Sequence, residues 1–327
     1  MLLFISRRFL NYLILLFIAV SLVYLLAATT LDPRSLYLER NPPIDPQTIE
    51  DSLQAYNLSN NIPLLERYWT WLTGVVTQWD WGQAPFGEHV NDEIGVRIWV
   101  SLRLVTLGSL FGIVIGVAVG AWTAVRQYKT SDRVITLFSL ILISTPILVI
   151  AVVLQLLAIQ ANNALGFQLF EFVGETGQTG DYPGAELVDR LQHLLLPTLS
   201  LALNGIAFYS RIQRNLMLDT LGADYVRTAR AKGLRRGTAL RKHALRTSLI
   251  PTGTYFAFTV AQLVLGSLFV ELIFNWHGMG IYGVQAIQQM DVHGSVAFAA
   301  FAGVCVLIGA TLSDVLVAVL DPRVRVS

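Results

Sequence analysis

Six apolar runs, each long enough to cross a lipid bilayer as a helix, constrain this 327-residue chain more than any other feature. About 20 consecutive apolar residues span the hydrocarbon layer, where a helix satisfies its own backbone groups. With 54% hydrophobic residues and a mean hydropathy of +0.56, the chain is too apolar for a soluble protein of this size. The runs are 9–31, 99–124, 134–160, 194–217, 248–274 and 296–320. The sequence therefore predicts an all-α integral membrane protein with six transmembrane helices.

Basic residues predict which side of the membrane each connecting segment faces. With the N-terminus inside, the outer segments 32–98, 161–193 and 275–295 hold five basic and sixteen acidic residues. The inner segments hold seventeen basic and four acidic residues. Because Lys and Arg are retained on the cytoplasmic side, both termini are expected in the cytoplasm.

The spans divide the chain into regions. The first apolar run is longer than the about 7–15 apolar residues of a signal peptide, so 1–31 is expected to be an uncleaved N-terminal segment and first span. Residues 32–98 form an extracytoplasmic insertion, and 99–320 a five-span core with a cytoplasmic loop at 218–247. Residues 321–327 are expected to be a cytoplasmic tail.

The insertion is predicted to be helical. Asp45 and Pro46 form a cap and first-turn proline, and Ile49, Leu53 and Tyr56 follow at helical spacing. Tryptophan prefers the headgroup layer, so a helical hairpin against the membrane is favoured over an aromatic ligand cage. The tryptophans near the outer surface are Trp69, Trp71, Trp79, Trp81 and Trp99.

A stripe of small residues marks the second span. One glycine in every four residues lets another helix backbone approach closely, and we favour packing within the chain over packing against a partner. The helix-packing residues are Gly108, Gly112, Gly116 and Gly120.

Charges and prolines inside the spans are few. Arg103 and Glu271 lie near outer ends, where snorkelling accounts for them. Asp314 lies near the inner end of its span and is expected to pair with basic groups there rather than to relay protons. Pro146 and Pro197 should kink or start their helices.

Familiar catalytic and metal-binding patterns are missing. No lysine follows a glycine, which excludes the phosphate-binding loop, and there is no H-E-x-x-H or G-x-S-x-G motif. The single cysteine, Cys305, excludes an intrachain disulfide. The sequence predicts no catalytic, cofactor-binding or metal-binding residue and no nucleic-acid partner.

The segment 224–246, DYVRTARAKGLRRGTALRKHALR, carries eight basic residues against the single acid Asp224. Its apolar residues indicate two short helices joined at Gly233, lying across the cytoplasmic mouth of the protein. The first stripe is Leu221, Tyr225, Val226 and Ala229, and the second is Leu240, Ala244 and Leu245. A bent, exposed pair of helices is suited to docking into a groove on another protein.

This segment resembles the cytoplasmic E-A-A-x-x-x-G loop of ABC-importer permeases in its dipeptide/oligopeptide form. The first three positions correspond to Arg227, Thr228 and Ala229, of which only Ala229 keeps the alanine, while Gly233 keeps the glycine. The resemblance extends through RYWTWLTGVVTQWDWGQ, HLLLPTLSLALNGIAFYSRIQRNLMLDTLGADYVRTARAKGL, VELIFNWHGMGIYGVQAI and SDVLVAVLDPRVRV. His277 stands where proline is usual in that branch.

The resemblance implies a type I ABC-importer permease fold in the bacterial inner membrane. A second permease subunit would complete the path for di- or oligopeptides, two cytoplasmic ABC ATPase domains would hold ATP and Mg, and an extracytoplasmic binding protein would deliver substrate. The chain would bind no cofactor, contact membrane lipid, and be no enzyme.

The resemblance also implies two contact regions. The ATPase-coupling residues are Asp224, Tyr225, Val226, Arg227, Thr228, Ala229, Arg230, Ala231, Lys232, Gly233 and Leu234. The residues facing the binding protein are Asn275, Trp276, His277, Gly278, Met279 and Gly280.

Other functions remain open at this point. An ion-coupled secondary transporter or channel would be expected to show an internal repeat and charges at the membrane midplane, and neither is found. A membrane enzyme or a structural scaffold has no motif in its favour. Within the ABC class, the cargo could be nickel, glutathione or an oligosaccharide instead of a peptide.

Overall fold

A computed structural model of the chain describes the backbone of residues 2–38, 41–177 and 184–320, and all of their side chains except those of 2–5, 257–258, 260–263, 265 and 320. The predicted tail 321–327 lies outside the described residues. The chain divides into two compact units. The first unit comprises Met1–Leu10, Arg103–Trp276 and Val306–Ser327, and the second comprises Asn11–Leu102 and His277–Cys305.

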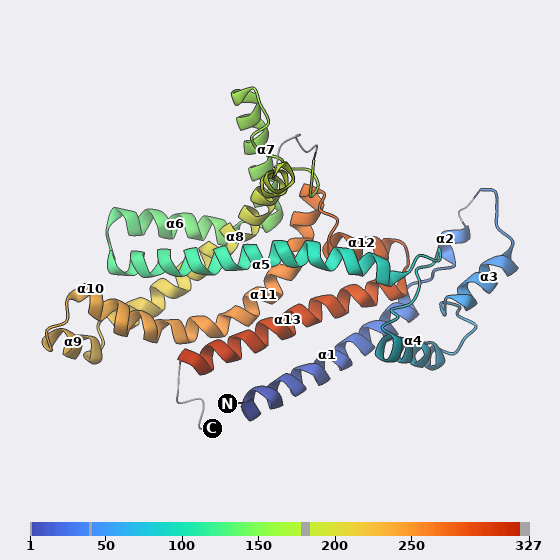
Figure 1. Ribbon diagram of the computed structural model, residues 1–327, viewed down its shortest axis with the longest axis horizontal. Helices are drawn as coiled ribbons and strands as arrows, with labels where there is room; N and C mark the ends of the chain where they lie inside the picture. Colours follow the sequence, from blue (N-terminus) through green and yellow to red (C-terminus); the bar gives the residue numbers. More distant parts are fainter. Residues whose placement is uncertain (1, 39–40, 178–183, 321–327) are drawn as a thin grey trace. The chain divides into compact units, whose positions relative to one another are not determined.

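The described residues fold into helices, with a lone bridge between Gln83 and His89 as their only extended pairing. Figure 1 shows the helices in chain order. They are α1 (Leu2–Thr30), α2 (Ser35–Leu38), α3 (Pro46–Ala55), α4 (Leu64–Gln78), α5 (Val90–Val125), α6 (Thr130–Ser144), α7 (Ile147–Leu165), α8 (Ala185–Leu221), α9 (Asp224–Ala231), α10 (Arg236–Ala239), the π-helix η1 (Leu240–Leu245), α11 (Arg246–Phe274), α12 (Met279–Gln288) and α13 (Val292–Leu320). The all-α prediction is confirmed.

Five stretches of the described chain are long and apolar enough to cross a membrane as helices. They are Ser6–Leu38, Val90–Val125, Ile147–Leu165, Ala185–Leu221 and Val292–Val319. The predicted span 248–274 coincides with the 29-residue helix α11. Each of the predicted spans therefore corresponds to helix, with one change in the third.

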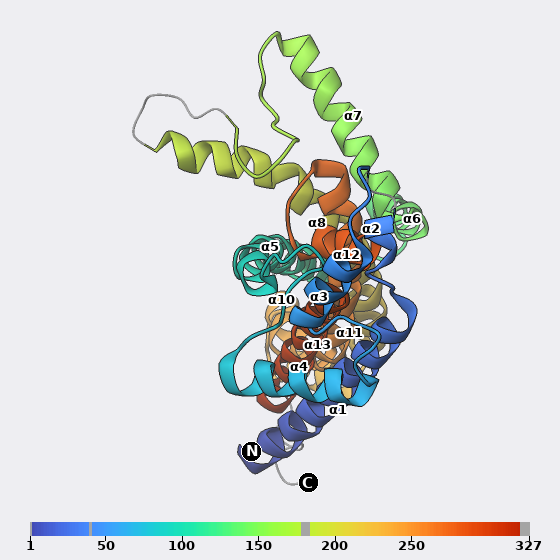
Figure 2. The same cartoon turned by 90° about the vertical axis from the view of Figure 1, so that its right-hand side faces the viewer.

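The third predicted span, 134–160, is divided into two helices at Pro146, which was expected to kink or start its helix. Helix α6 ends at Ser144 and Pro146 is the N-cap of α7, because a proline ring disfavours helical backbone in the residue before it. The two helices diverge steeply (Figures 1 and 2). Pro197, in contrast, lies inside α8, which continues through it.

Helix α8 is the central element of the first unit, where it packs against α6, α7 and α11. The glycine stripe of α5 lies against the same helix. A Cβ on Gly112 would lie 3.2 Å from the Cα of Gly205, and one on Gly120 would lie 2.5 Å from the backbone oxygen of Ser210. Contacts this close need a residue without a side chain.

The second unit contains the predicted N-cap of α3 and an aromatic core. Asp45 accepts a hydrogen bond from the backbone N of Thr48, and Ile49 and Leu53 of α3 are buried. Trp71 stacks on Tyr24, with ring centroids 4.7 Å apart. Trp71 and Trp81 are therefore core residues, whereas the exposed tryptophans of this unit are Trp69, Trp79 and Trp99.

The charged residues predicted inside the spans have separate environments. Asp314 forms an ion pair with Arg8, as expected for a partner of basic groups. Arg103 forms an ion pair with Glu175, with 3.0 Å between Nη2 and Oε2. Glu271 is fully buried within the protein, so snorkelling to the membrane surface does not account for it.

Candidate functional site

The basic loop folds as two short helices joined at a glycine. Helix α9 follows α8 after Gly222, and α10 leads through η1 into α11. Gly233 lies between them with a φ of +90°. The residues 224–234 singled out in the sequence thus form α9 and the turn that ends it.

The turn after α9 is a Schellman motif. The N–H of Leu234 donates to the carbonyl of Ala229 at 3.3 Å, and the N–H of Gly233 donates to Arg230 at 3.0 Å. This motif requires a left-handed residue at the Gly233 position, where glycine has no steric penalty. A Cβ on Gly233 would meet nothing within 4 Å, so its requirement for glycine is conformational.

A small apolar core lies beneath this loop. Val226 and Ala229 of α9 are buried with residues from the ends of α5 and α8 and from α10 and η1. The buried members of the core are Ala124, Met217, Val226, Ala229, Ala239, Leu240 and Ala244. Because one face of α9 is anchored here, a displacement of α9 would be transmitted to α8.

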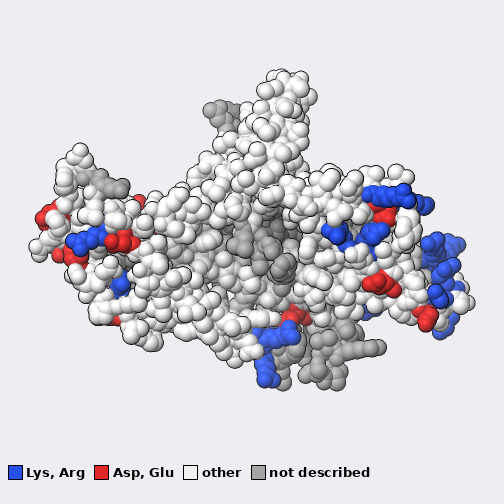
Figure 3. Space-filling model, turned by 180° about the vertical axis from the view of Figure 1, so that it is seen from behind, with Lys and Arg blue, Asp and Glu red and all other residues white. Residues whose placement is uncertain are grey.

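The opposite face of the loop is charged and open to solvent. Figure 3 shows basic side chains gathered over α9 and α10. The exposed ones are Arg227, Arg230, Lys232, Arg235, Arg236, Arg241, Lys242 and Arg246. Tyr225 is also exposed, at 43%. The loop therefore offers a basic surface with one aromatic ring to a partner.

A buried polar network joins α8 to α11 directly behind the loop. The side-chain amide of Gln213 donates to the Oγ of Ser248 at 2.7 Å and accepts from the Oγ1 of Thr252 at 2.6 Å. Gln213 is fully buried. The sequence interpretation missed this network, although a glutamine in a predicted span was the available signal, since polar groups there need partners.

A second connection fixes α6 to α8. Arg214 holds Asp132 with two hydrogen bonds, Nε to Oδ1 at 2.6 Å and Nη2 to Oδ2 at 2.9 Å. The Tyr128 N–H adds a third, and Asp132 is 2% exposed. The Arg214 guanidinium, with the Tyr128 N–H, lowers the pKa of Asp132 below its ordinary value. The residues are 82 positions apart, and no sequence pattern pairs them.

The loop that was predicted to face a binding protein is only partly accessible. Asn275 ends α11 in the left-handed conformation, which asparagine tolerates. Asn275 and His277 are exposed, whereas the other four predicted contact residues are buried. The buried residues are Trp276, Gly278, Met279 and Gly280. Only Asn275 and His277 remain candidates for a direct contact of their side chains with a partner.

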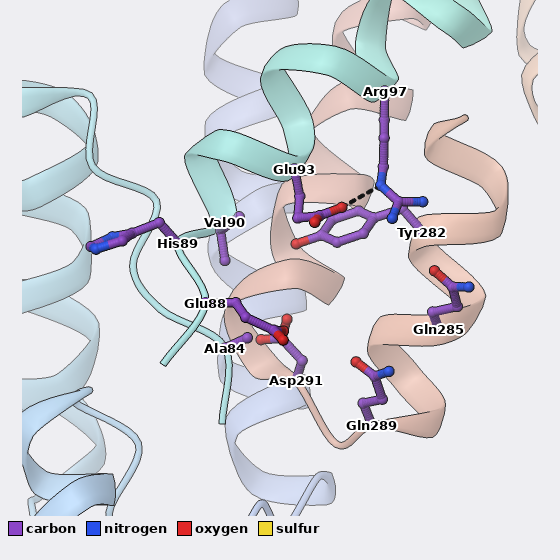
Figure 4. A pocket seen from close by; sticks show the side chains of 10 residues that line it. All are labelled: Ala84, Glu88, His89, Val90, Glu93, Arg97, Tyr282, Gln285, Gln289 and Asp291. Carbon is purple, nitrogen blue, oxygen red and sulfur yellow. Dashed lines mark hydrogen bonds and ion pairs between the residues drawn. The ribbon is translucent and has the colours of Figure 1, made fainter. Parts of the chain in front are cut away.

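A polar pocket of about 120 Å³ lies in the second unit beside α12. In Figure 4, Arg97 reaches from α5 over Tyr282, and the carboxylates of Glu88 and Asp291 point toward each other. Arg97 pairs with Glu93 at 2.5 Å and lies 5.3 Å from the Tyr282 ring centroid. Among the described residues, no three His, Cys, Asp or Glu side chains form a metal-binding group.

Asp291 caps the helix that follows this pocket. Its Oδ1 accepts a hydrogen bond from the Gly294 N–H at 2.9 Å, at the start of α13. Asp291 is 3% exposed, and this burial raises its pKa to about 6. An aspartate directly before an apolar run is an N-cap signature that the sequence interpretation did not use.

The stability of the second unit is expected to fall as the pH rises from about 4 to about 7, because ionised Asp291 is disfavoured in the folded state. The pKa of Asp291 in the folded state is about 6, against an ordinary value of 3.8. The stability that the protonated carboxyl contributes is therefore complete at low pH and is lost as the pH rises through 6. Asp291→Asn should remove this slope and stabilise the protein at neutral pH by on the order of 3 kcal/mol. Melting curves in detergent across this pH range measure it.

The matched control for this prediction is Asp51→Asn, which removes an exposed carboxylate of the same unit. This variant should keep the pH dependence of the native protein. An Asp291→Asn variant with the native slope would show that another group causes it.

The comparisons with known proteins agree with this architecture. Residues 112–326 match the family described as binding-protein-dependent transport system inner membrane component. The oligopeptide transport system permease protein OppB of Mycobacterium tuberculosis is 49% identical over 99% of both chains. In Bacillus subtilis, the oligopeptide permease protein AppB is 32% identical over 98% of both chains, and the dipeptide permease protein DppB is 30% identical over 85% of both. The chain therefore belongs to the family of binding-protein-dependent transport system inner membrane components.

Proposed function

We propose that this chain is a membrane-spanning permease subunit of an ATP-driven importer of di- and oligopeptides. It would form the translocation path with a second permease, and an extracytoplasmic binding protein would deliver the cargo. The observation that carries the proposal is the 49% identity to an oligopeptide transport permease over 99% of both chains. Relatives named for oligopeptide and dipeptide transport support the cargo class.

The basic loop is the proposed contact for two cytoplasmic ATPase domains. Its residues 224–234 present an exposed charged face, while Val226 and Ala229 anchor the other face to the ends of the spans. Movement of an ATPase against α9 would shift α8 and α11 together, because Gln213 and Ser248 hydrogen-bond across them. Such a shift can bias an equilibrium between two states of the path.

The proposed orientation follows from charge. The loop and both termini would lie in the cytoplasm, and the insertion 32–98 would lie outside the inner membrane, where Asn275 and His277 are available to the binding protein. The chain itself would be non-catalytic and would bind no cofactor. ATP and Mg would be held by the partner subunits.

Reconstitution in lipid vesicles tests the proposal. Vesicles holding this chain with its second permease and ATPases are expected to take up trialanine only when ATP and loaded binding protein are both present. The matched control holds this chain alone and should show only passive leakage. Full-rate uptake by the chain alone would contradict the proposed dependence on a separate ATPase.

A further inference from the structure

A cavity of about 310 Å³ lies in the first unit at the predicted outer ends of α5, α8 and α11. This volume falls at the lower end of the range of small-molecule sites. Its lining residues are Arg103, Glu175, Thr176, Arg190, Leu194 and Trp276. Two arginines against one glutamate make it basic, although the predicted outer segments together carry far more acidic than basic residues.

The wall formed by residues 174–177 is held in place by hydrogen bonds to the surrounding helices. The Gly174 N–H donates to the carbonyl of Phe274 at the end of α11, at 2.8 Å. The Gly177 N–H donates to both carboxylate oxygens of the buried Asp189 on α8, at 2.9 and 3.1 Å. Since the Arg103–Glu175 ion pair adds a connection to α5, the wall is fixed to three helices.

Trp276 contributes an unused donor to the lining. It is 2% exposed, and its buried indole N–H has no acceptor among the described residues. In contrast, the indole N–H of Trp71 donates to the carbonyl of Trp81 at 3.2 Å. A buried donor without a partner is costly. Because this nitrogen has almost no accessible surface, an acceptor in the cavity would reach it and remove that cost after the indole ring turns toward it.

We propose that this cavity binds the terminal carboxylate of a peptide during import. Arginine matches a carboxylate with parallel N–H donors, and Arg103 and Arg190 both line the cavity, with the Trp276 indole as a neutral donor. Glu175 keeps Arg103 oriented toward the wall. This inference rests on the proposed function, because it assumes that the cargo has a free C-terminus.

The cavity and the basic loop share two helices. Arg190 and Leu194 lie near the start of α8, which runs without a break to Leu221, where the loop begins. Trp276 follows the end of α11, whose other end joins η1. A joint shift of α8 and α11 relative to α5, which carries Arg103, would therefore change the spacing of the carboxylate-binding groups and release the peptide when the ATPases move the loop.

A single reporter cysteine tests the binding directly. Cys305 is buried and is the only cysteine of this chain, so a Thr176→Cys, Cys305→Ser variant, assembled into the complete transporter in phospholipid nanodiscs, has one thiol in this chain, on the cavity wall, and alkylation is followed on this chain. Trialanine should slow alkylation of this thiol by a membrane-impermeant maleimide by about tenfold, because charge-assisted contacts hold the carboxylate beside it. Trialanine amide, which lacks the negative charge, should protect the thiol little.

Further variants connect the protection to the lining. Arg190→Gln or Trp276→Phe should abolish the protection by trialanine, and Arg190→Lys should keep part of it. Arg133 is an exposed arginine of α6, and Arg133→Gln is the matched control. In this variant trialanine should protect the reporter thiol as well as it does without the substitution.

The contrary results distinguish failure of the carboxylate site from failure of the proposed function. Equal protection by trialanine and its amide would show that the cavity does not recognise the carboxylate. A thiol that reacts slowly in phospholipid without peptide, and rapidly in maltoside detergent, would assign the cavity to a lipid phosphate. Protection that persists in a complex without ATP-dependent uptake would refute the proposed function and leave the binding site standing.

Discussion

A Gly233→Val variant is expected to reach the membrane at the native level and to lose ATP-dependent peptide uptake by about tenfold or more. Gly233 has a φ of +90°, a conformation that a β-branched residue adopts only at a clear energetic cost. The variant would lose the Schellman turn, so α9 would no longer present its basic face in the native direction. Uptake and binding-protein-stimulated ATPase activity, normalised to the amount of inserted protein, measure the effect.

Gly237→Val provides the control in the same loop. A Cβ on either glycine would meet nothing within 4 Å, and only Gly233 has a positive φ. The control should therefore retain most of the uptake. If both variants transported peptide and coupled ATP hydrolysis at the native rate, residues 224–234 would not be the coupling element.

An Asp132→Ala variant should destabilise the protein by on the order of 3 kcal/mol, because it leaves the Arg214 guanidinium without its carboxylate. Arg214 makes two hydrogen bonds to Asp132, which is almost completely buried. The apparent melting temperature in detergent should fall by on the order of 5 °C. Because the pKa of Asp132 is lowered, native stability from this pair should persist at neutral pH and disappear only in strong acid.

Two variants separate this pair from a general effect of charge. Asp224→Ala removes a carboxylate whose ion pair with Arg227 is long, at 3.9 Å, and almost fully exposed, so it should leave the melting temperature unchanged. Asp132→Asn combined with Arg214→Gln replaces the ion pair by neutral amides and should recover much of the loss. An unaltered melting temperature in Asp132→Ala would show that the pair does not hold α6 to α8.

The helices of this protein could be predicted from the sequence because hydropathy is a property of each segment alone. Glycine spacing in α5 marked a close contact, although the partner helix α8 came only from the structure. Pro146 predicted a change in the direction of the helix, but both a kink and the start of a new helix satisfy its backbone restriction. The choice depends on what α6 and α7 pack against.

The polar contacts were much harder to predict from the sequence. Asp132 and Arg214 are 82 residues apart and join only when α6 lies on α8. Glu271 looked suited to the headgroup layer by its position in the span, yet it is buried. The burial of Trp276 likewise depends on tertiary packing, so its role in a cavity could not be predicted from a loop that matched a family pattern.

The π-helix η1, between α10 and α11, has a geometric consequence for the loop. A π-turn inserts one residue more than an α-turn into an otherwise continuous helix, and one residue corresponds to about 100° of rotation about the axis. The π-helix Leu240–Leu245 therefore rotates the residues before it about the helix axis. This rotation determines the direction in which the basic face of the loop points relative to the membrane-embedded part of α11. Deleting a single residue there would preserve the hydropathy of the loop while turning its charges toward a different neighbour.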